Sequence, residues 1–325
     1  MKYLIIDDEH ELYKQMYAEL LRTDLYDVEE IRRMRKPQKW KLLYKIHFSP
    51  KLNAHFYIPF KFIWNSYYDL NHYNFKDGEQ YTVLFLNGSV KVHYNKYFFK
   101  KLKKRNPNVK LVLIMYDSVK HARSVQTLKM FDVFDTVFSF DEEDCYRYGF
   151  KRLYSTFSIP DFVEEDKTLK SAAFFIGRGD DRTNLLKKIF KKVTAAIDGC
   201  RFYITDVDEE DIEEIKDVIF NQRMAYCDEL RMAYNTDCII EIVRDGQNGI
   251  SLRTCEAVAF RKKLITNNKS IAKMPFYNPQ FMKIISDEND IDLDFIRSLV
   301  NVDYGERNYF SPLLILKQLE ELNGR

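Results

Sequence analysis

The chain has 325 residues, of which 46% are hydrophobic and 31% are charged, and its formal net charge is +2. This length suits two domains rather than one core, and the nearly balanced charge gives no global reason to expect nucleic-acid binding. Five cysteines, never in a CxxC pair, argue against a disulfide scaffold or a structural zinc site. The sequence shows no signal peptide and no apolar stretch of the roughly 18 residues that a membrane span needs, so we expect a cytoplasmic protein.

The N-terminal half alternates apolar runs with helical segments. The apolar runs predict strands at residues 2–6, 81–86, 110–116 and 133–140. Asp7 and Asp8 follow the first strand, and we expect them to cap a helix over residues 10–22. An acidic run at residues 141–144 is expected to open another helix, because carboxylates are favourable at a helix N-terminus. The alternation predicts a parallel α/β domain over residues 1–160.

One segment of this half combines basic and aromatic side chains. Residues 31–64 contain nine Lys or Arg residues and no Asp or Glu, and residues 96–105 are a second basic segment that predicts an amphipathic helix. Such a mixture can hold a phosphate-bearing partner or lie on an anionic membrane surface; the alternative is a helix with one side in the core and a solvated basic side. Nucleic acid is not expected, because the chain has no recognisable nucleic-acid-binding module. The interleaved aromatic residues are Trp40, Tyr44, Phe48, Phe56, Tyr57, Phe60, Phe62 and Trp64.

The pattern of strands and helices starts again in the C-terminal half. A strand at residues 172–176 is followed by a turn with Gly177, Arg178 and Arg182, and then by a predicted helix over residues 183–197. Free N–H groups at a helix N-terminus favour an anion, so this turn is a candidate phosphate contact. The remaining predicted elements are strands at 200–205, 238–243, 264–266 and 282–285 and helices at 208–215, 292–300 and 309–322.

Residues 238–268 give the most specific pattern in the chain. A buried strand is followed by residues 244–249, whose glycines favour a turn, and then by a helix that Ser251 or Thr254 would cap. A loop that enters a helix at the carboxyl edge of a parallel sheet is where α/β folds bind phosphorylated ligands. The segment therefore predicts a second anion contact.

This segment also carries a family resemblance. It contains Gln247-x-Gly249-x-Ser251-x-Arg253-x-x-Glu256-Ala257, followed by Lys262-Lys263-Leu-Ile-Thr-Asn267. The pattern resembles the donor-site segment of GT-B glycosyltransferases, in particular a bacterial group assigned to lipopolysaccharide, capsule or exopolysaccharide biosynthesis. The resemblance is strongest over residues 171–268 and weaker over 80–160. The better-known motif of these enzymes has two glutamates separated by seven residues, and Glu241 and Glu256 depart from that spacing.

The resemblance implies an α/β protein of the GT-B class. Two Rossmann-like parallel α/β domains would face a cleft, with an acceptor-binding domain over residues 1–160 and a nucleotide-sugar-binding domain over residues 161–308. Residues 309–325 would return as a helix to the N-terminal domain.

The same resemblance implies a glycosyltransferase of bacterial surface polysaccharide biosynthesis. It would move a sugar from a nucleotide-sugar donor to a glycan or lipid-linked acceptor without a metal or further cofactor, in the cytoplasm or at the inner face of the membrane. Asp117, at the end of the clearest strand of the N-terminal half, is the first candidate for the catalytic base, followed by His47 and His121. The expected donor-site residues are Gly177, Arg178, Arg182, Gln247, Gly249, Ser251, Arg253, Glu256 and Lys263.

Two other functions stay open at the level of the sequence. One is a binding or scaffold protein with the GT-B shape and no turnover. The other is a GT-B-shaped sugar-nucleotide epimerase or hydrolase, which would act without an acceptor.

Overall fold

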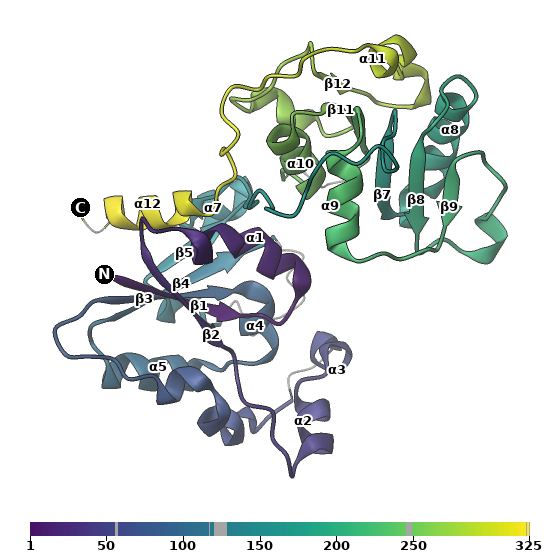
Figure 1. Cartoon of the computed structure of the whole chain (residues 1–325). Coiled ribbons are helices and arrows are strands. Elements are labelled where there is room, and N and C mark those ends of the chain that lie inside the picture. Colours follow the sequence, from purple (N-terminus) through teal and green to yellow (C-terminus); the bar gives the residue numbers. More distant parts are fainter. Residues whose placement is uncertain (56–57, 117, 120–128, 245–248, 323, 325) are drawn as a thin grey trace. The chain divides into compact units, whose positions relative to one another are not determined.

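The computed structural model describes residues 1–55, 58–116, 118–119, 129–244, 249–322 and 324. The chain forms two compact units, each with a six-stranded, wholly parallel sheet (Figure 1). Unit 1 comprises Met1–Tyr154 and Pro312–Arg325, and unit 2 comprises Ser155–Ser311. The α/β class is confirmed, and the C-terminal segment returns to unit 1 as predicted.

The sheet of unit 1 has the strand order β2-β1-β3-β4-β5-β6. Its strands are β1 (Lys2–Asp7), β2 (Asp27–Arg32), β3 (Tyr81–Leu86), β4 (Val109–Met115), β5 (Thr136–Ser139) and β6 (Lys151–Arg152). Its α-helices are α1 (Glu11–Arg22), α2 (Lys41–His47), α3 (Pro50–His55), α4 (Asn87–Val92), α5 (Lys96–Arg105), α7 (Glu142–Tyr148) and α12 (Leu313–Leu322). Among its described residues are also the 3-10 helices η1 (Lys61–Tyr67), η2 (Asp69–His72) and η3 (Phe131–Val133).

The centre of this sheet is covered on both faces. All six residues of β3 are buried, which agrees with its largely apolar sequence YTVLFL. Helix α5 turns Phe98, Phe99 and Leu102 into the core and leaves lysines outside, and the side chain of Asn95 caps it by accepting a hydrogen bond from the Phe98 N–H at 2.9 Å. The predicted amphipathic helix over residues 96–105 is thus confirmed.

The structure corrects two details of the N-terminal prediction. Strand β2 was not predicted, because it is an edge strand of sequence DVEEIR in which only Ile31 is buried. The predicted cap of α1 is also wrong: the imidazole of His10 accepts a hydrogen bond from the Leu12 N–H at 3.3 Å. Asp8 instead forms a buried ion pair with Arg33, with 2.8 Å between Oδ1 and Nη1.

The sheet of unit 2 has the order β12-β11-β10-β7-β8-β9. Its strands are β7 (Phe174–Arg178), β8 (Arg201–Thr205), β9 (Val218–Phe220), β10 (Cys238–Glu241), β11 (Lys263–Thr266) and β12 (Met282–Ile284). Its α-helices are α8 (Thr183–Thr194), α9 (Tyr226–Tyr234), α10 (Leu252–Phe260) and α11 (Leu293–Arg297). Its 3-10 helices are η4 (Asp180–Arg182), η5 (Glu209–Asp211), η6 (Lys269–Lys273) and η7 (Glu288–Asp290).

Alternating side chains of β7 build the two faces of this unit. Phe174 and Ile176 join the apolar cluster that includes residues of α9 and α10, whereas Phe175 points to the opposite cluster with Phe190 of α8. Phe190 in turn stacks on Phe202 of β8, with ring centroids 4.1 Å apart. The sheet therefore has helices against both faces.

The acidic segment of unit 2 differs from the prediction. A helix was expected over residues 208–215, but the structure has only the short turn η5 there, followed by strand β9. Strand β9 has three residues, so its sequence offers too little alternation to be recognised. The acidic residues of this segment lie in a turn whose side chains are not buried.

None of the helices in the described part of the chain combines the length and the apolar character needed to cross a bilayer.

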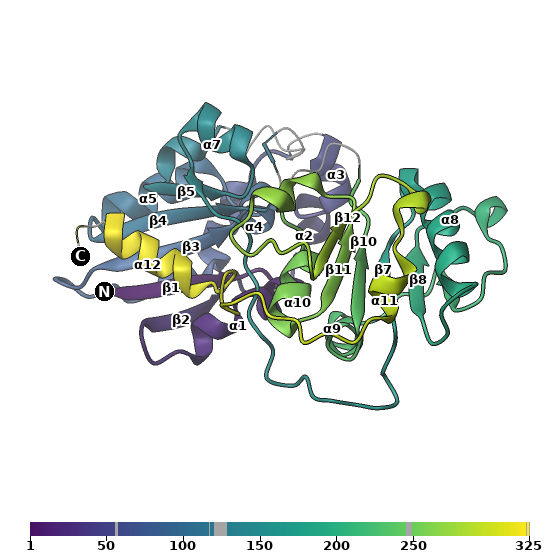
Figure 2. The same ribbon diagram turned by 90° about the horizontal axis from the view of Figure 1, so that it is seen from above.

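Helix α12 packs beside the strands of unit 1 in both views (Figure 1 and Figure 2). The hydroxyl of Tyr26 donates to Glu320 at 3.3 Å, and Leu316 is fully buried, whereas Leu322 is 47% exposed. This helix is therefore part of the core of unit 1 although it lies at the other end of the sequence.

We expect Leu316→Ala to destabilise unit 1 by about 2–5 kcal/mol, because it leaves a cavity in the core. Both tryptophans, Trp40 and Trp64, belong to unit 1, so tryptophan fluorescence during urea unfolding follows this unit alone. Leu322→Ala on the same helix is the control and should change the free energy of unfolding by less than about 0.5 kcal/mol. Equal effects of the two substitutions would contradict the packing of α12.

Candidate functional site

Unit 2 has a topological switch point between β7 and β10. These strands are neighbours in the sheet, but β8 follows β7 on one side and β11 follows β10 on the other. The connections that leave their carboxyl ends therefore diverge and open a crevice above the sheet edge, which is where open α/β sheets bind ligands.

The connection from β7 to α8 approaches its neighbours closely. The N–H of Gly179 donates to the Thr205 carbonyl at 2.7 Å, which holds the connection against β8. A Cβ atom at Gly179 would lie 2.4 Å from Thr183 Oγ1 and 2.8 Å from a methyl group of Val207, so only glycine fits. Asp180 follows with a left-handed backbone (φ 45°), a conformation that Asp and Asn adopt more readily than other side chains.

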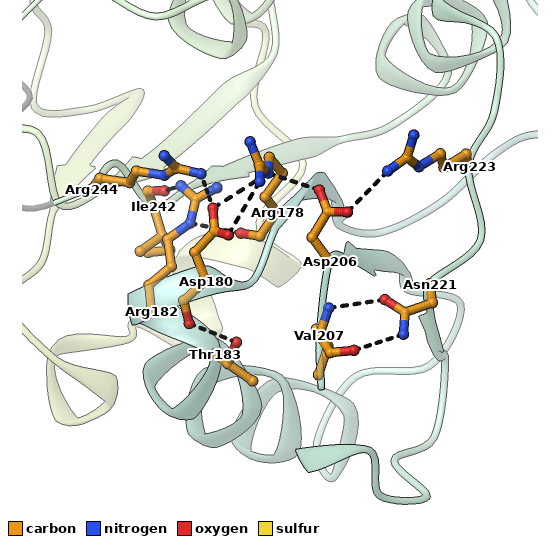
Figure 3. A network of polar contacts seen from close by, with 10 residues as sticks. All are labelled: Arg178, Asp180, Arg182, Thr183, Asp206, Val207, Asn221, Arg223, Ile242 and Arg244. Atoms are coloured by element: carbon orange, nitrogen blue, oxygen red, sulfur yellow. Dashed lines mark hydrogen bonds and ion pairs between the residues drawn. The ribbon is translucent and has the colours of Figure 1, made fainter. Parts of the chain in front are cut away.

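Three arginines and two aspartates meet at this edge (Figure 3). Arg178 Nε lies 2.7 Å from one carboxylate oxygen of Asp206, and Arg223 Nη2 lies 3.0 Å from the other. Asp180 pairs with Arg244 and also lies 3.4 Å from Arg178. We call Arg178, Asp180, Asp206, Arg223 and Arg244 the carboxyl-edge cluster.

The charge and the exposure of the cluster favour binding of an anion from solvent. Its formal charges are three positive and two negative, and the arginine side chains are exposed: 57% for Arg178, 80% for Arg223 and 41% for Arg244. Each guanidinium group has five N–H donors, more than the two carboxylates use. Exposed ion pairs add little to stability. The arrangement is therefore better explained by binding than by folding.

Arg182 braces the two sides of the switch point. Its Nε donates to the Arg178 carbonyl at 2.8 Å, and its Nη1 donates to the Ile242 carbonyl just after β10 (Figure 3). Burial lowers the pKa of the Arg182 guanidinium. The side chain thus ties the connection after β7 to the one after β10 and positions the arginines around it.

The N-terminus of α10 is fixed to the same edge. Ser251 caps the helix, as predicted, because its Oγ accepts the Arg253 N–H at 3.0 Å. Its hydroxyl also donates to the buried carboxylate of Glu241, which further accepts hydrogen bonds from the hydroxyls of Thr254, at 2.9 Å, and Thr266. The carbonyl of Gly249, just before the cap, accepts a hydrogen bond from Asn268 Nδ2 at 3.0 Å.

Arg253, Glu229 and Glu256 form an ion-paired triad in which Glu256 is fully buried and Arg253 and Glu229 are 16% and 19% exposed. Arg253 pairs with Glu229 of α9 and, at 2.5 Å, with Glu256, which also accepts a hydrogen bond from the Tyr226 hydroxyl at 3.3 Å. Burial raises the pKa of Glu256 to about 7, although Arg253 acts in the opposite direction. Burial opposes the charge on Arg253, but the two carboxylates outweigh it and raise its pKa. These groups join α9 to α10 and do not reach the cluster through any described contact.

Lys263 lies at the other end of its strand. It begins β11, so it stands at the amino-terminal edge of the sheet, away from the carboxyl ends. Its ammonium group is buried and donates to the carbonyls of Phe295, Ile296 and Ser298, at 2.8, 2.7 and 2.5 Å. The structure therefore brings Gly177, Arg178, Arg182 and Ser251 to the switch point, but not Lys263.

Of the proposed catalytic bases, only His47 can be described, and it is buried in unit 1. Its Nδ1 accepts a hydrogen bond from Trp64 Nε1 at 2.8 Å, and burial together with the charge of Lys61 lowers its pKa. Because indole N–H can only donate, the neutral ring carries its proton on Nε2 and has no free acceptor nitrogen. Asp117 and His121, like Gln247 of unit 2, lie outside the described residues.

Four members of the cluster are absent from the set that the sequence predicts. They are Asp180, Asp206, Arg223 and Arg244, and each stands within three residues after the end of a strand. For Asp180, Asp206 and Arg244 the available signal was a charged residue soon after a predicted strand, whereas Arg223 follows β9, which was not predicted. The order of the strands in the sheet brings these four residues together, and the sequence pattern does not predict that order.

Cavities also lie at the amino-terminal edges of the two sheets. One of about 620 Å³ in unit 1 is lined by residues that include Lys110 and Thr136, at the starts of β4 and β5. One of about 640 Å³ in unit 2 includes Asp237 and Lys262, directly before β10 and β11. Ligands of open α/β sheets bind at the opposite edge, so we assign the candidate site to the carboxyl-edge cluster. Within the described residues, no three His, Cys, Asp or Glu side chains are grouped so that they could hold a metal ion.

Comparisons with known proteins identify the fold. No protein-family model matches the sequence, and no curated protein matches it. An α-glucosyltransferase, solved with UDP and a 13-mer DNA with a central A:G mismatch, is similar in structure with a TM-score of 0.54 and 12% identity, over 100% of both chains. A protein assigned as a UDP-N-acetylglucosamine 2-epimerase from Listeria monocytogenes has a TM-score of 0.52 and 9% identity, over 98% of this chain and 97% of that one. The chain has the GT-B fold.

The raised pKa of Glu256 predicts a pH dependence of stability. Between about pH 4.5, the ordinary pKa of a glutamate, and about pH 7 the folded chain binds more protons at Glu256 than the unfolded chain. The free energy of unfolding should therefore fall as the pH rises through this window, by on the order of 3 kcal/mol.

Glu256→Gln should remove this part of the pH dependence, because the amide does not titrate. Urea unfolding followed by circular dichroism at several pH values measures the effect. The control is Glu214→Gln, an exposed residue, which should keep the wild-type dependence. A Glu256→Gln curve parallel to the wild-type curve would refute the assignment.

Proposed function

We propose that the chain is a glycosyltransferase that uses a nucleotide-sugar donor. The carboxyl-edge cluster carries this proposal, because three partly exposed arginines stand at the switch point of unit 2. Guanidinium groups form charge-assisted, often bidentate hydrogen bonds with phosphate oxygens. The GT-B fold, and the presence of UDP in the similar α-glucosyltransferase, support a nucleoside diphosphate as the ligand.

The cluster would act on the leaving group of the transfer. When the bond between the sugar and the diphosphate breaks, negative charge develops on the diphosphate, and preorganised cations there stabilise the transition state. Asp180 and Asp206 hold the guanidinium groups of Arg178, Arg223 and Arg244 in place before the ligand arrives. Little reorganisation would then be needed during the reaction.

The acceptor hydroxyl needs a base within hydrogen-bond distance. Of the candidates, His47 is the least suited, because its acceptor nitrogen is engaged by Trp64. Asp117 remains our first choice and His121 the second. We further propose a glycan or lipid-linked acceptor in bacterial surface polysaccharide biosynthesis, on the strength of the resemblance over residues 171–268, and contact with an anionic membrane, which is argued below.

A sugar-nucleotide epimerase is the second candidate. The observation that favours it is the structural similarity to the Listeria monocytogenes protein, which has the same fold. The carboxyl-edge cluster would serve both reactions, because both act on a nucleoside diphosphate sugar. Only the fate of the sugar separates them.

Nucleotide binding tests the assignment of the cluster. We expect one of UDP, GDP, CDP or ADP to bind in isothermal titration calorimetry, and the double substitution Arg178→Ala/Arg244→Ala to weaken binding by about tenfold or more, because charge-assisted hydrogen bonds contribute about 1.5–3 kcal/mol each. The control is Arg231→Ala, which removes an arginine of similar exposure that is paired with Asp228 on α9. Absence of binding by all four nucleotides, or an equal loss in the control, would remove the cluster from the donor site.

The reaction itself is tested by product mass. The nucleotide sugar that binds is incubated with and without a bacterial glycolipid acceptor fraction, and the products are analysed by mass spectrometry. A transferase adds one sugar mass to an acceptor and releases the nucleotide. Conversion of the donor to an isomer of the same mass, without acceptor, would instead establish an epimerase.

A further inference from the structure

Helices α2, η1 and α5 of unit 1 expose large apolar side chains. Trp40 is 61% exposed and Leu42 73%, and Phe60 and Phe62 in the η1 region are 64% and 57% exposed. Tyr97 of α5 is 63% exposed. Solitary exposed apolar residues are ordinary, but several large ones on neighbouring elements mark an interaction surface.

These elements form one continuous surface. Phe62 and Ile63 of η1 line a cavity of about 320 Å³ together with Tyr97 and Lys101 of α5. Helix α2 packs against η1 through Tyr44, whose ring centroid lies 5.8 Å from that of Trp64. Figure 1 shows α2 at the periphery of unit 1, away from the sheet.

The residues beneath this surface form a closely packed core in which polar groups are hydrogen-bonded to one another. The His47 ring accepts the Trp64 N–H, and the buried ammonium group of Lys61 donates to Asn53 Oδ1 at 2.6 Å and to the Val92 carbonyl at 2.5 Å. Phe48 stacks on His93 with ring centroids 4.6 Å apart. The exposed residues are therefore not needed to complete this core, and their exposure needs a different explanation.

The charge around the exposed residues of α2 is of one sign, whereas on α5 Lys96 pairs with Asp132 and Lys103 with Asp135. In α2, Leu42 and Ile46 are four residues apart and form an apolar ridge, and Lys41 and Lys45 form a basic ridge beside it. No acidic residue occurs in residues 31–64. The surrounding lysines make no ion pair with any residue that the structure describes; they are Lys39, Lys41, Lys45, Lys51, Lys100, Lys101 and Lys104.

We propose that this surface, which we call the basic–aromatic surface, docks on an anionic lipid bilayer. Aromatic rings settle at the depth of the headgroups, short apolar ridges enter the acyl boundary, and unpaired lysines attract anionic lipids. Nucleic acid would use the lysines and could stack on the aromatic rings, but it would leave the aliphatic ridge of Leu42 and Ile46 without a partner. The combination of aliphatic, aromatic and unbalanced basic groups is the one that a lipid surface satisfies in full.

Tryptophan fluorescence gives a direct test. The full-length chain has two tryptophans, of which Trp40 is exposed and Trp64 is 2% exposed, so a change on docking reports on Trp40. With vesicles of phosphatidylcholine mixed with phosphatidylglycerol, the emission should shift to shorter wavelength and be quenched by brominated lipid. Binding to vesicles of phosphatidylcholine alone should be at least about tenfold weaker. The Trp40→Phe variant should bind without the spectral shift.

Matched variants separate the surface from general effects. In vesicle co-sedimentation, Lys41→Glu/Lys45→Glu and Leu42→Ser/Ile46→Ser should each lose about tenfold or more in binding. The controls in unit 2 are Lys167→Glu/Lys170→Glu, which makes the same charge change at exposed lysines, and Leu299→Ser at a residue that is 87% exposed. All variants should keep the wild-type unfolding midpoint, which verifies that they fold.

Three results would overturn the proposal. They are absence of binding to anionic vesicles, equal losses in the control variants, and displacement of the protein from vesicles by a duplex DNA oligonucleotide that binds more tightly, which would assign the surface to nucleic acid. No donor or acceptor is present in these experiments. Failure of the proposed transferase activity would therefore leave their outcome unchanged.

Discussion

A single buried carboxylate, that of Glu241, fixes the geometry on which the candidate site depends. It stands at the end of β10 and accepts hydrogen bonds from Ser251, Thr254 and Thr266. A buried charge is tolerated only when hydrogen bonds replace its water. The three hydroxyls do this, and in doing so they lock the start of α10 and the end of β11 to β10. Arg182 extends the lock to the connection after β7 through the Ile242 carbonyl.

The partners of each cation in unit 2 explain which cations can bind a ligand. Arg182, Arg253 and Lys263 donate their hydrogen bonds to carbonyls or carboxylates inside unit 2. Arg178 and Arg244 instead meet aspartates at the surface and keep donors toward solvent. A cation can bind an exchangeable ligand only when its hydrogen-bond donors are not already occupied by groups inside the protein. The exposed pair meets this condition and the buried ones do not.

The charged groups at the switch points of the two units differ in their exposure to solvent. In unit 1 the sheet changes direction between β1 and β3, and Asp8 at the end of β1 pairs with Arg33 there; both side chains are only 7% exposed. The hydroxyl of Ser89, after β3, also donates to Asp8, so this carboxylate is held inside the unit, whereas Arg33 Nε has no partner among the described residues. In unit 2 the comparable arginines face solvent. The contrast supports the proposal that phosphate binds in unit 2.

The sequence predicts what depends on local pattern, and it fails where the arrangement of strands decides. The buried strand β3, the helix over residues 96–105 and the Ser251 cap follow from the apolar pattern and from capping chemistry, and all are present. The edge strands β2 and β9 carry too few buried residues to be recognised.

The site follows the same division. Arg178 could be predicted because it stands between two glycines after a strand, but its partner Asp206 and the nearby Arg244 come from other strands of the sheet. Arg253 and Lys263 are cations in the segment that resembles a donor site. Nothing in that segment shows that Glu229 will pair with Arg253, or that carbonyls at the end of α11 will bind Lys263.

The way in which positive charge is presented separates the two binding surfaces. In the carboxyl-edge cluster each arginine contacts an aspartate, so its position is set in advance, which suits one ligand with phosphates at fixed positions. On the basic–aromatic surface the lysines have no acidic neighbours in residues 31–64, and their long stems remain free to move. Such charges suit a partner whose anionic groups are also mobile, because no fixed geometry has to be matched. A lipid headgroup layer has that property and a single nucleotide does not.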